Sequence, residues 1–147
     1  MSAVKAAWFV GAWHLVSYER RLEDGTVDYP LGQDLKGLLI YLENGNMSVQ
    51  LMLANRTKFQ SNDMWTGTAE EYRDAFTTYT AYFGRYTVHE DESFVEHHVD
   101  GSLFPNWSGG VQKRFVSFGE GTLTLSSEAG ILGSQKCTVS LCWRSSP

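Results

Sequence analysis

The chain has 147 residues, of which 42% are hydrophobic and 20% charged, a composition typical of a folded domain and not of a disordered or fibrous chain. The formal net charge is −5 and no basic stripe exists that could neutralise phosphates, so we expect no nucleic-acid partner. No apolar run is long enough to span a bilayer, so we expect no membrane partner either. The length predicts one domain over residues 1–147.

The two cysteines, Cys137 and Cys142, fall in one expected strand. At about 3.3 Å per residue they would lie roughly 16 Å apart on opposite faces. A disulfide needs Cα atoms within about 7 Å, so we expect both thiols to stay reduced. We interpret the N-terminal segment as folded structure and not as a signal peptide, which together with the thiols predicts a cytoplasmic location.

Eight segments have the alternation and the turn boundaries of strands. Asn44-Gly45, between two apolar segments, is the strongest hairpin signal in the chain. Short, mostly hairpin-connected strands predict a mostly β fold, either an up-and-down antiparallel barrel or a sandwich. The expected strands cover about 13–21, 36–42, 46–53, 85–89, 94–101, 111–118, 122–127 and 135–144.

One segment has helical periodicity instead. Apolar residues recur on a single helical face after Thr68, at Tyr72, Ala75, Phe76, Tyr79, Tyr82 and Phe83. Thr68 and Glu71 have the spacing of a capping box, and Gly84 is able to end a helix. The pattern predicts one inserted α-helix over about 68–83, which would cover a wall or the mouth of a barrel.

The faces of the first hairpin follow from its turn. A two-residue Asn44-Gly45 turn would place an apolar set inside, with Ile40 opposite Val49, Leu42 opposite Met47 and Leu38 opposite Leu51. The opposite face would then be outside and still fairly apolar, at Leu39, Tyr41, Ser48, Gln50 and Met52. Either the helix or a second subunit would have to cover it, so a homodimer is a possible partner arrangement.

The hairpin around Asp91-Glu92 places a polar group on an apolar wall. Its register pairs Tyr86 with His97 and faces both inward, together with Val88. Burial would lower the pKa of His97 and keep it neutral, and Tyr86 would be its hydrogen-bond donor. The pair could act on a ligand or could be a satisfied core pair, and a one-residue bulge would exchange His97 for His98.

Other candidates line the same interior. If Trp13 points inward, alternation carries Ser17 and Glu19 with it, although Glu19 fits a solvated rim position as well. Arg114 lies on a strand whose inner face is undecided; facing inward, it could clamp a ligand carboxylate or enolate. The predicted ligand-binding residues are Trp13, Ser17, Glu19, Ile40, Met47, Val49, Leu51, Val88, His98 and Trp107, the last from an aromatic loop that either frames an entrance or packs a barrel end.

Metal and cofactor chemistry is not expected. His97 and His98 are adjacent on a strand, so they point to opposite faces and cannot jointly hold one ion. Neither a glycine-rich phosphate loop nor a dinucleotide fingerprint occurs, and no serine has the strand–elbow–helix context of a hydrolase.

Several runs of sequence resemble a known family. Gly11-Ala12-Trp13 near the start and Trp143-Arg144 near the end resemble the calycin pattern, in which the arginine packs on the tryptophan ring. Over nearly the whole chain, GAWHLVSYE, PLG, GLLIY, YFGRYTVHED and HHVDGSLFPNW resemble the small lipocalin-like domain family of bacteria and fungi. The resemblance implies a lipocalin-like up-and-down barrel of about eight strands. It assigns no single reaction, although some members belong to secondary-metabolite pathways.

These observations predict a barrel that encloses a small apolar or aromatic metabolite. One hypothesis is a cofactor-free enzyme, an isomerase, cyclase or dehydratase acting on a polyketide- or terpenoid-like substrate. His97 would be its general acid or base, Tyr86 the partner and Arg114 the electrostatic stabiliser. A second hypothesis is a non-catalytic carrier or sensor of a small hydrophobic ligand, and a third is a structural or dimerisation module. We prefer the enzyme, because an acid–base pair on an apolar wall is not required for carrying.

Overall fold

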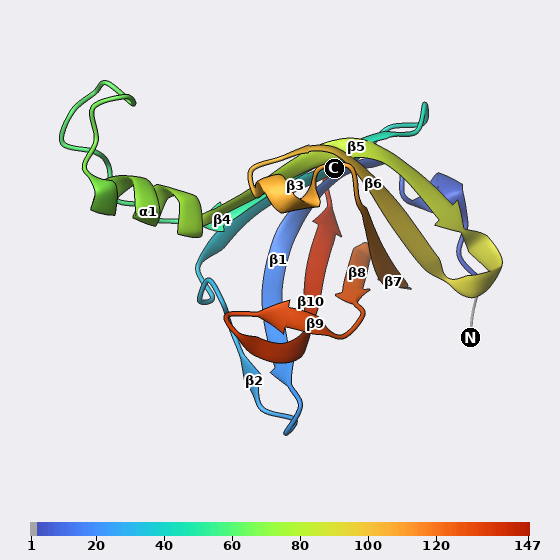
Figure 1. The fold of residues 1–147 in the computed structure, drawn as a ribbon. Helices are drawn as coiled ribbons and strands as arrows, with labels where there is room; N and C mark the ends of the chain where they lie inside the picture. The colour runs from blue at the N-terminus through green and yellow to red at the C-terminus, as the bar shows by residue number, and fades with distance from the viewer. Residues whose placement is uncertain (1–2) are drawn as a thin grey trace.

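The computed structural model describes residues 3–147, which form an antiparallel β-barrel with one α-helix (Figure 1). Within these residues eight strands close the barrel, because β10 pairs with both β8 and β1, and two short strands extend it. The up-and-down barrel predicted from the sequence is confirmed. The barrel strands are β1 (Gly11–Leu22), β3 (Leu35–Tyr41), β4 (Asn46–Leu53), β5 (Tyr79–His89), β6 (Phe94–Ser102), β7 (Val111–Gly119), β8 (Thr122–Ser127) and β10 (Gln135–Ser145); the short ones are β2 (Val27–Asp28) and β9 (Gly130–Leu132).

The helix is shorter than the sequence predicted and lies elsewhere. Helix α1 covers Ala69–Thr77, begins at the expected Thr68–Glu71 capping box and ends at Thr78. None of its residues is buried, and it projects away from the barrel (Figure 1). The prediction that it covers a wall or the mouth was therefore wrong.

The residues assigned to the second half of that helix belong to β5. Tyr82 points into the barrel, whereas Phe83 is 56% exposed, as alternation in a strand requires. The segment is rich in aromatic and threonine residues, which fit a pleated sheet, and it pairs with β4 over seven residues. Gly84 is not a helix cap: a Cβ there would lie 1.9 Å from the His98 carbonyl oxygen, so glycine allows β6 to approach β5 closely.

The β3–β4 hairpin has a different register from the one predicted. Tyr41 pairs with Met47 and Leu39 with Val49, and the Leu42 N–H donates to the Asn46 carbonyl oxygen at 2.9 Å. The loop therefore contains three residues, 43–45, with Gly45 at φ +93°. A two-residue type I′ turn would need a positive φ at Asn44 as well, but only Gly45 of this pair has one, as the three-residue loop requires. The faces of β3 are consequently exchanged: Leu39 and Tyr41 are fully buried inside, and Ile40, a predicted ligand-binding residue, faces outward.

A bulge in β1 changes which residues of that strand face inward, so the alternation predicted from Trp13 onward was wrong. Leu15 pairs with Trp143 and Ser17 with Cys142, so Val16 is an extra residue on the β1 side. The inner face therefore passes from Leu15 to Tyr18. Ser17 and Glu19, both predicted to line the interior, lie on the outer face instead.

Aromatic rings close one end of the barrel. The 3₁₀-helix η1 (Ala6–Trp8) leads to Phe9, which is fully buried with its ring 5.4 Å from Tyr41 and 5.1 Å from Phe118. Trp13 packs on Phe118 and its Nε1 donates to the Phe9 carbonyl oxygen at 2.8 Å. Trp13 thus belongs to the closed end.

The expected contact between Arg144 and Trp13 is wrong. Arg144 is exposed and pairs with the exposed His14, whereas Trp13 is buried, so the guanidinium lies on the outer face of the sheet.

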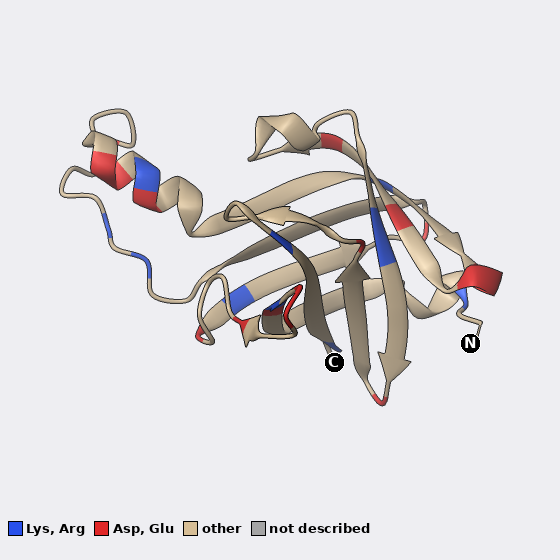
Figure 2. Ribbon diagram, turned by 60° about the horizontal axis from the view of Figure 1, so that its bottom comes forward, with Lys and Arg blue, Asp and Glu red and all other residues tan. Residues whose placement is uncertain are grey.

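Lysine and arginine are scattered over the barrel among aspartate and glutamate (Figure 2). Among residues 3–147, no helix combines the length and the apolar character needed to cross a membrane.

Candidate functional site

The barrel contains a cavity of about 370 Å³. Apolar side chains of five strands form much of its wall: Leu39, Val49, Leu51, Val111, Leu125, Val139, Leu141 and Trp143. At one end the lining includes the exposed residues Glu128 and Ile131, so there the cavity reaches the surface. The aromatic rings around Phe9 close the other end of the barrel, so the cavity is a pocket with one mouth.

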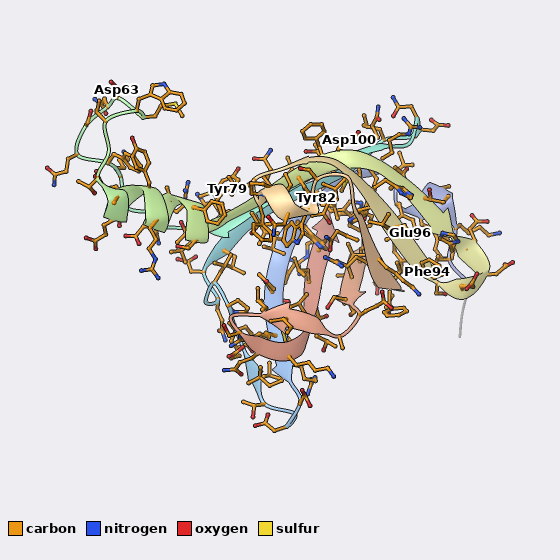
Figure 3. The ribbon with its side chains drawn as sticks, viewed as in Figure 1. Asp63, Tyr79, Tyr82, Phe94, Glu96 and Asp100 are labelled. Carbon is orange, nitrogen blue, oxygen red and sulfur yellow. The ribbon has the colours of Figure 1, made fainter. Side chains whose placement is uncertain are left out.

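Three buried polar side chains form what we call the inner cluster: Tyr41, Tyr82 and His97. The Tyr41 hydroxyl lies 2.6 Å from His97 Nε2, and the Tyr82 hydroxyl lies 2.6 Å from His97 Nδ1. Tyr41 is fully buried, His97 is 2% exposed and Tyr82 is 8% exposed. His97 and Tyr82 line the cavity, while Tyr41 lies behind them against the Phe9 ring. Figure 3 labels Tyr82 on β5, beside the barrel interior.

The predicted partner of His97 is the wrong tyrosine. Tyr86 does pair with His97 in the β5–β6 register, as expected. Its hydroxyl, however, donates to the Leu42 carbonyl oxygen at 2.7 Å, and its ring packs on Tyr41 at 4.7 Å. Tyr86 therefore supports the inner cluster from the side and is not a hydrogen-bond partner of the imidazole.

Burial sets the protonation of the inner cluster. It lowers the pKa of His97 from 6.5 to about 3, and the nearby positive charge of Arg114 acts in the same direction. Burial also raises the pKa of Tyr82, and raises that of Tyr41 well above its ordinary value. Desolvation disfavours the charged form of each group. At neutral pH the imidazole and both phenols are consequently uncharged.

Arg114 brings a positive charge to the cavity. It lies on β7, half-buried, and lines the cavity near the inner cluster. Its guanidinium donates to Gln112 Oε1 at 3.1 Å and to the Lys113 carbonyl oxygen at 2.9 Å. Within the described chain no carboxylate lies within ion-pair distance of Arg114. Its charge is thus not neutralised by a protein partner.

Trp143 contributes a donor without an acceptor. The indole is 1% exposed and belongs to the cavity lining. Among residues 3–147 no partner accepts a hydrogen bond from its buried Nε1–H. A buried donor without an acceptor costs free energy, so a ligand that accepts a hydrogen bond from this N–H would gain affinity.

The remaining predicted residues separate into two groups. Val49, Leu51, Trp107 and Arg114 line the cavity, with the Trp107 ring 6.0 Å from Tyr82. Met47 and Val88 face the core without lining the cavity, and Trp13 belongs to the closed end. His98 faces outward and hydrogen-bonds Thr87 Oγ1 at 3.1 Å, so the register places His97 inside as predicted. The ligand-binding role of these residues stays a prediction.

Sequence reasoning missed Tyr41 and Tyr82. Tyr41 was assigned to the outer face because the hairpin loop was taken one residue too short, and Tyr82 was assigned to the helix. Gly45 was an available signal, since glycine after Asn44 suits a three-residue loop with a left-handed residue as well as a two-residue turn. Among the described residues no group of three His, Cys, Asp or Glu side chains could hold a metal ion.

Comparisons with known proteins agree with this architecture. The family model described as the lipocalin-like domain matches residues 10–145. A relative from Aspergillus oryzae (strain ATCC 42149 / RIB 40) is 36% identical over 87 residues, which cover 55% of this chain and 78% of the relative. That protein is named 4′-hydroxy-3′-methoxypropiophenone carrier protein ppsC. No solved structure gives a significant match.

Proposed function

Because this chain belongs to the lipocalin-like domain family, we propose that it is a carrier that binds one small, mostly apolar, aromatic molecule inside the barrel. The observation that supports this most is the cavity of about 370 Å³, which has one mouth and an apolar wall interrupted by a few buried polar groups. Ligand pockets commonly span about 300–1,000 Å³ with this division between apolar walls and orienting polar groups.

The aromatic lining favours an aromatic ligand. Tyr18, Tyr82, Trp107 and Trp143 contribute rings to the cavity wall. Aromatic rings pack on one another in edge-to-face or offset geometry with a gain beyond the area they bury. The relative named as a carrier of an aromatic ketone supports the same class of ligand.

An acid–base enzyme is the second candidate. The observation in its favour is the free charge of Arg114 beside a neutral imidazole, an arrangement that could stabilise an enolate. Against it, a general base works best with a pKa near the working pH, and the pKa of His97 is about 3. Both His97 ring nitrogens are also occupied by tyrosine hydroxyls. Carriage therefore fits the geometry better.

The test combines native mass spectrometry of the purified protein with calorimetric titration of 4′-hydroxy-3′-methoxypropiophenone. We expect a retained small molecule or saturable 1:1 binding of this ketone. Val49→Phe fills the cavity from an inward position and should weaken binding at least tenfold. Val16→Phe makes the same change on the outer face, where Val16 is 41% exposed, and should leave binding unchanged. If the protein retains no small molecule and does not bind the ketone, the proposal is overturned. Equal binding of the ketone by a folded Val49→Phe variant would also overturn it.

The two candidate functions differ in one further measurement. An acid–base enzyme acting on a ketone would accelerate exchange of the hydrogens next to its carbonyl for deuterium in D₂O. A carrier leaves that exchange at the rate seen in buffer, which is our expectation. Acceleration that disappears in His97→Leu would assign the enzymatic role instead.

A further inference from the structure

The inner cluster has a direction that follows from counting its protons. A neutral imidazole carries one N–H donor and one nitrogen lone pair. His97 is neutral because burial holds its pKa near 3. Both ring nitrogens lie 2.6 Å from a tyrosine hydroxyl, so one tyrosine must donate to His97 and the other must accept from it.

The surroundings of Tyr41 decide which tyrosine donates. Its hydroxyl is completely buried, and within residues 3–147 His97 Nε2 is its only hydrogen-bond partner. If Nε2 carried the proton, the Tyr41 hydroxyl would accept it and its own hydrogen would have no acceptor. A buried donor left without an acceptor loses its hydration and gains nothing in return. Tyr41 therefore donates to Nε2, and the imidazole proton lies on Nδ1.

The consequence falls on Tyr82. Its hydroxyl oxygen accepts from Nδ1–H, so its own hydrogen is not used within the cluster. Unlike Tyr41, Tyr82 lines the cavity. Successive donors that point the same way polarise one another, which strengthens the last donor of the chain. The order is Tyr41 to His97 to Tyr82, and it ends at the cavity.

We propose that the Tyr82 hydroxyl donates a hydrogen bond to a ketone or aldehyde oxygen of the bound ligand, and that Tyr41 and His97 are positioning residues that hold it as a donor. This inference rests on the proposed carrier function and names the group by which the ligand is recognised. Trp143, which lines the same cavity, supports this inference, because its buried Nε1–H also lacks a hydrogen-bond acceptor.

A neutral carbonyl fits the inner cluster better than a carboxylate does. Tyr41, Tyr82 and His97 are uncharged at neutral pH, and burying a carboxylate against them would cost its hydration without a countercharge in contact. Arg114 already donates to Gln112 and to the Lys113 carbonyl. The Lys113 ammonium lies over the Phe94 and Phe115 rings, and Glu128 adds a negative charge to the lining. The chain as a whole carries a net charge of −5, which does not attract anions.

The test compares two ligands that differ in one group. The first is 4′-hydroxy-3′-methoxypropiophenone, and the second, 2-methoxy-4-propylphenol, has the same ring substituents with a CH₂ in place of the carbonyl. Calorimetry gives the ratio of their affinities for the wild type, for Tyr82→Phe and for Tyr86→Phe. The last is a matched control, since its hydroxyl bonds to Leu42 and faces neither ligand nor His97.

We expect the preference for the ketone to fall about tenfold in Tyr82→Phe and to stay at the wild-type value in Tyr86→Phe. An unchanged ratio in a folded Tyr82→Phe variant overturns the inference while leaving the carrier function intact. Failure of both ligands to bind the wild type instead refutes the carrier function, so the two failures are distinguishable. Tighter binding of 4-hydroxy-3-methoxybenzoate than of the ketone would also overturn the inference, in favour of an anion site at Arg114.

A second measurement needs no variant. Isotope-edited infrared spectroscopy of the ketone with a ¹³C carbonyl reports whether the bound oxygen accepts a hydrogen bond. We expect the carbonyl band of the complex to lie well below its frequency in cyclohexane. A band at the cyclohexane frequency means that no donor reaches the oxygen, which contradicts the inference.

Discussion

The two faces of the β5–β6 hairpin each carry a histidine bonded to oxygen at 2.6 Å, in opposite surroundings. Inside, His97 lies between two buried tyrosine hydroxyls and lines the cavity. Outside, His89 Nε2 donates to Glu96 Oε1, its ring stacks on Phe94 at 4.2 Å, and about a third of each partner is exposed. Figure 3 labels Phe94 and Glu96 near the β5–β6 turn, away from Tyr82.

The difference lies in what each partner loses when the contact is broken. Water replaces a lost partner at the outer pair, so the contact is worth little. At the inner cluster Tyr41 is inaccessible to water, so breaking a hydrogen bond leaves buried polar groups unpaired. Equal distances therefore carry unequal free energies, and the buried contacts also fix which way each proton points.

The largest expected effect is that of removing the inner imidazole. His97→Leu leaves the Tyr41 and Tyr82 hydroxyls without their partner and should lower the free energy of unfolding by about 2–6 kcal/mol, at about 1–3 kcal/mol for each unsatisfied buried group. His89→Leu, the same change on the outer face, should cost less than about 1 kcal/mol. Urea unfolding at pH 7 measures both. Similar losses in the two variants would refute the contrast.

Acid should destabilise the protein through His97. The folded-state pKa of about 3 lies below the ordinary value of 6.5, so between these values the unfolded chain binds the extra proton. This contribution to stability is complete above pH 6.5 and is lost as the pH falls toward 3, at up to roughly 1.4 kcal/mol per pH unit. From pH 6.5 to pH 5 the wild type should lose about 2 kcal/mol more than His97→Leu does. Parallel urea unfolding curves at several pH values for the two proteins provide the check; identical pH dependence would count against a buried neutral His97.

Phenylalanine substitutions distinguish Tyr41, which hydrogen-bonds His97, from Tyr86, which pairs with His97 only through the strand register. Tyr41→Phe leaves His97 Nε2 buried without a partner and should cost about 1–2 kcal/mol. Tyr86→Phe removes a hydrogen bond to a backbone carbonyl near the surface and should cost less than about 1 kcal/mol. Chemical denaturation ranks the two variants. The reverse ranking would mean that Tyr86, and not Tyr41, holds the imidazole.

The smallest effect is expected at the outer pair. A double-mutant cycle of His89→Ala and Glu96→Ala should give a coupling of about 0.2–1 kcal/mol. Added salt should reduce this coupling, because ions screen exposed charges, and should leave the cost of Tyr41→Phe unchanged. A coupling above about 2 kcal/mol, or one that salt does not affect, would place the outer pair in the same class as the inner cluster.

Strand periodicity predicted the barrel and the inward position of His97, but not the partners of His97. The Tyr86–His97 pairing is local to one hairpin and follows from alternation. The contacts of Tyr41 and Tyr82 depend on two details that alternation does not contain, the three-residue loop at Gly45 and the strand that replaces the end of the helix. A shift of one residue turns a side chain to the other face, as it did for Ile40 and, through the Val16 bulge, for Ser17 and Glu19.

The helix illustrates a second limit. Its start was predictable because the capping box of Thr68 and Glu71 is encoded within four residues. Its end was not, because the residues from Tyr79 onward satisfy a helical period and a strand period equally well. Pairing with β4, which is distant in the sequence, decides between helix and strand.

The most direct test of the account is the position of the single proton on the His97 ring. Long-range ¹H–¹⁵N correlation spectra of uniformly labelled protein at pH 7 distinguish protonated from bare ring nitrogens, and the His97→Leu spectrum identifies this ring among the four histidines. We expect a neutral ring with a protonated Nδ1 and a bare Nε2, which directs the Tyr82 hydroxyl toward the ligand. A proton on Nε2, or on both nitrogens, would contradict it.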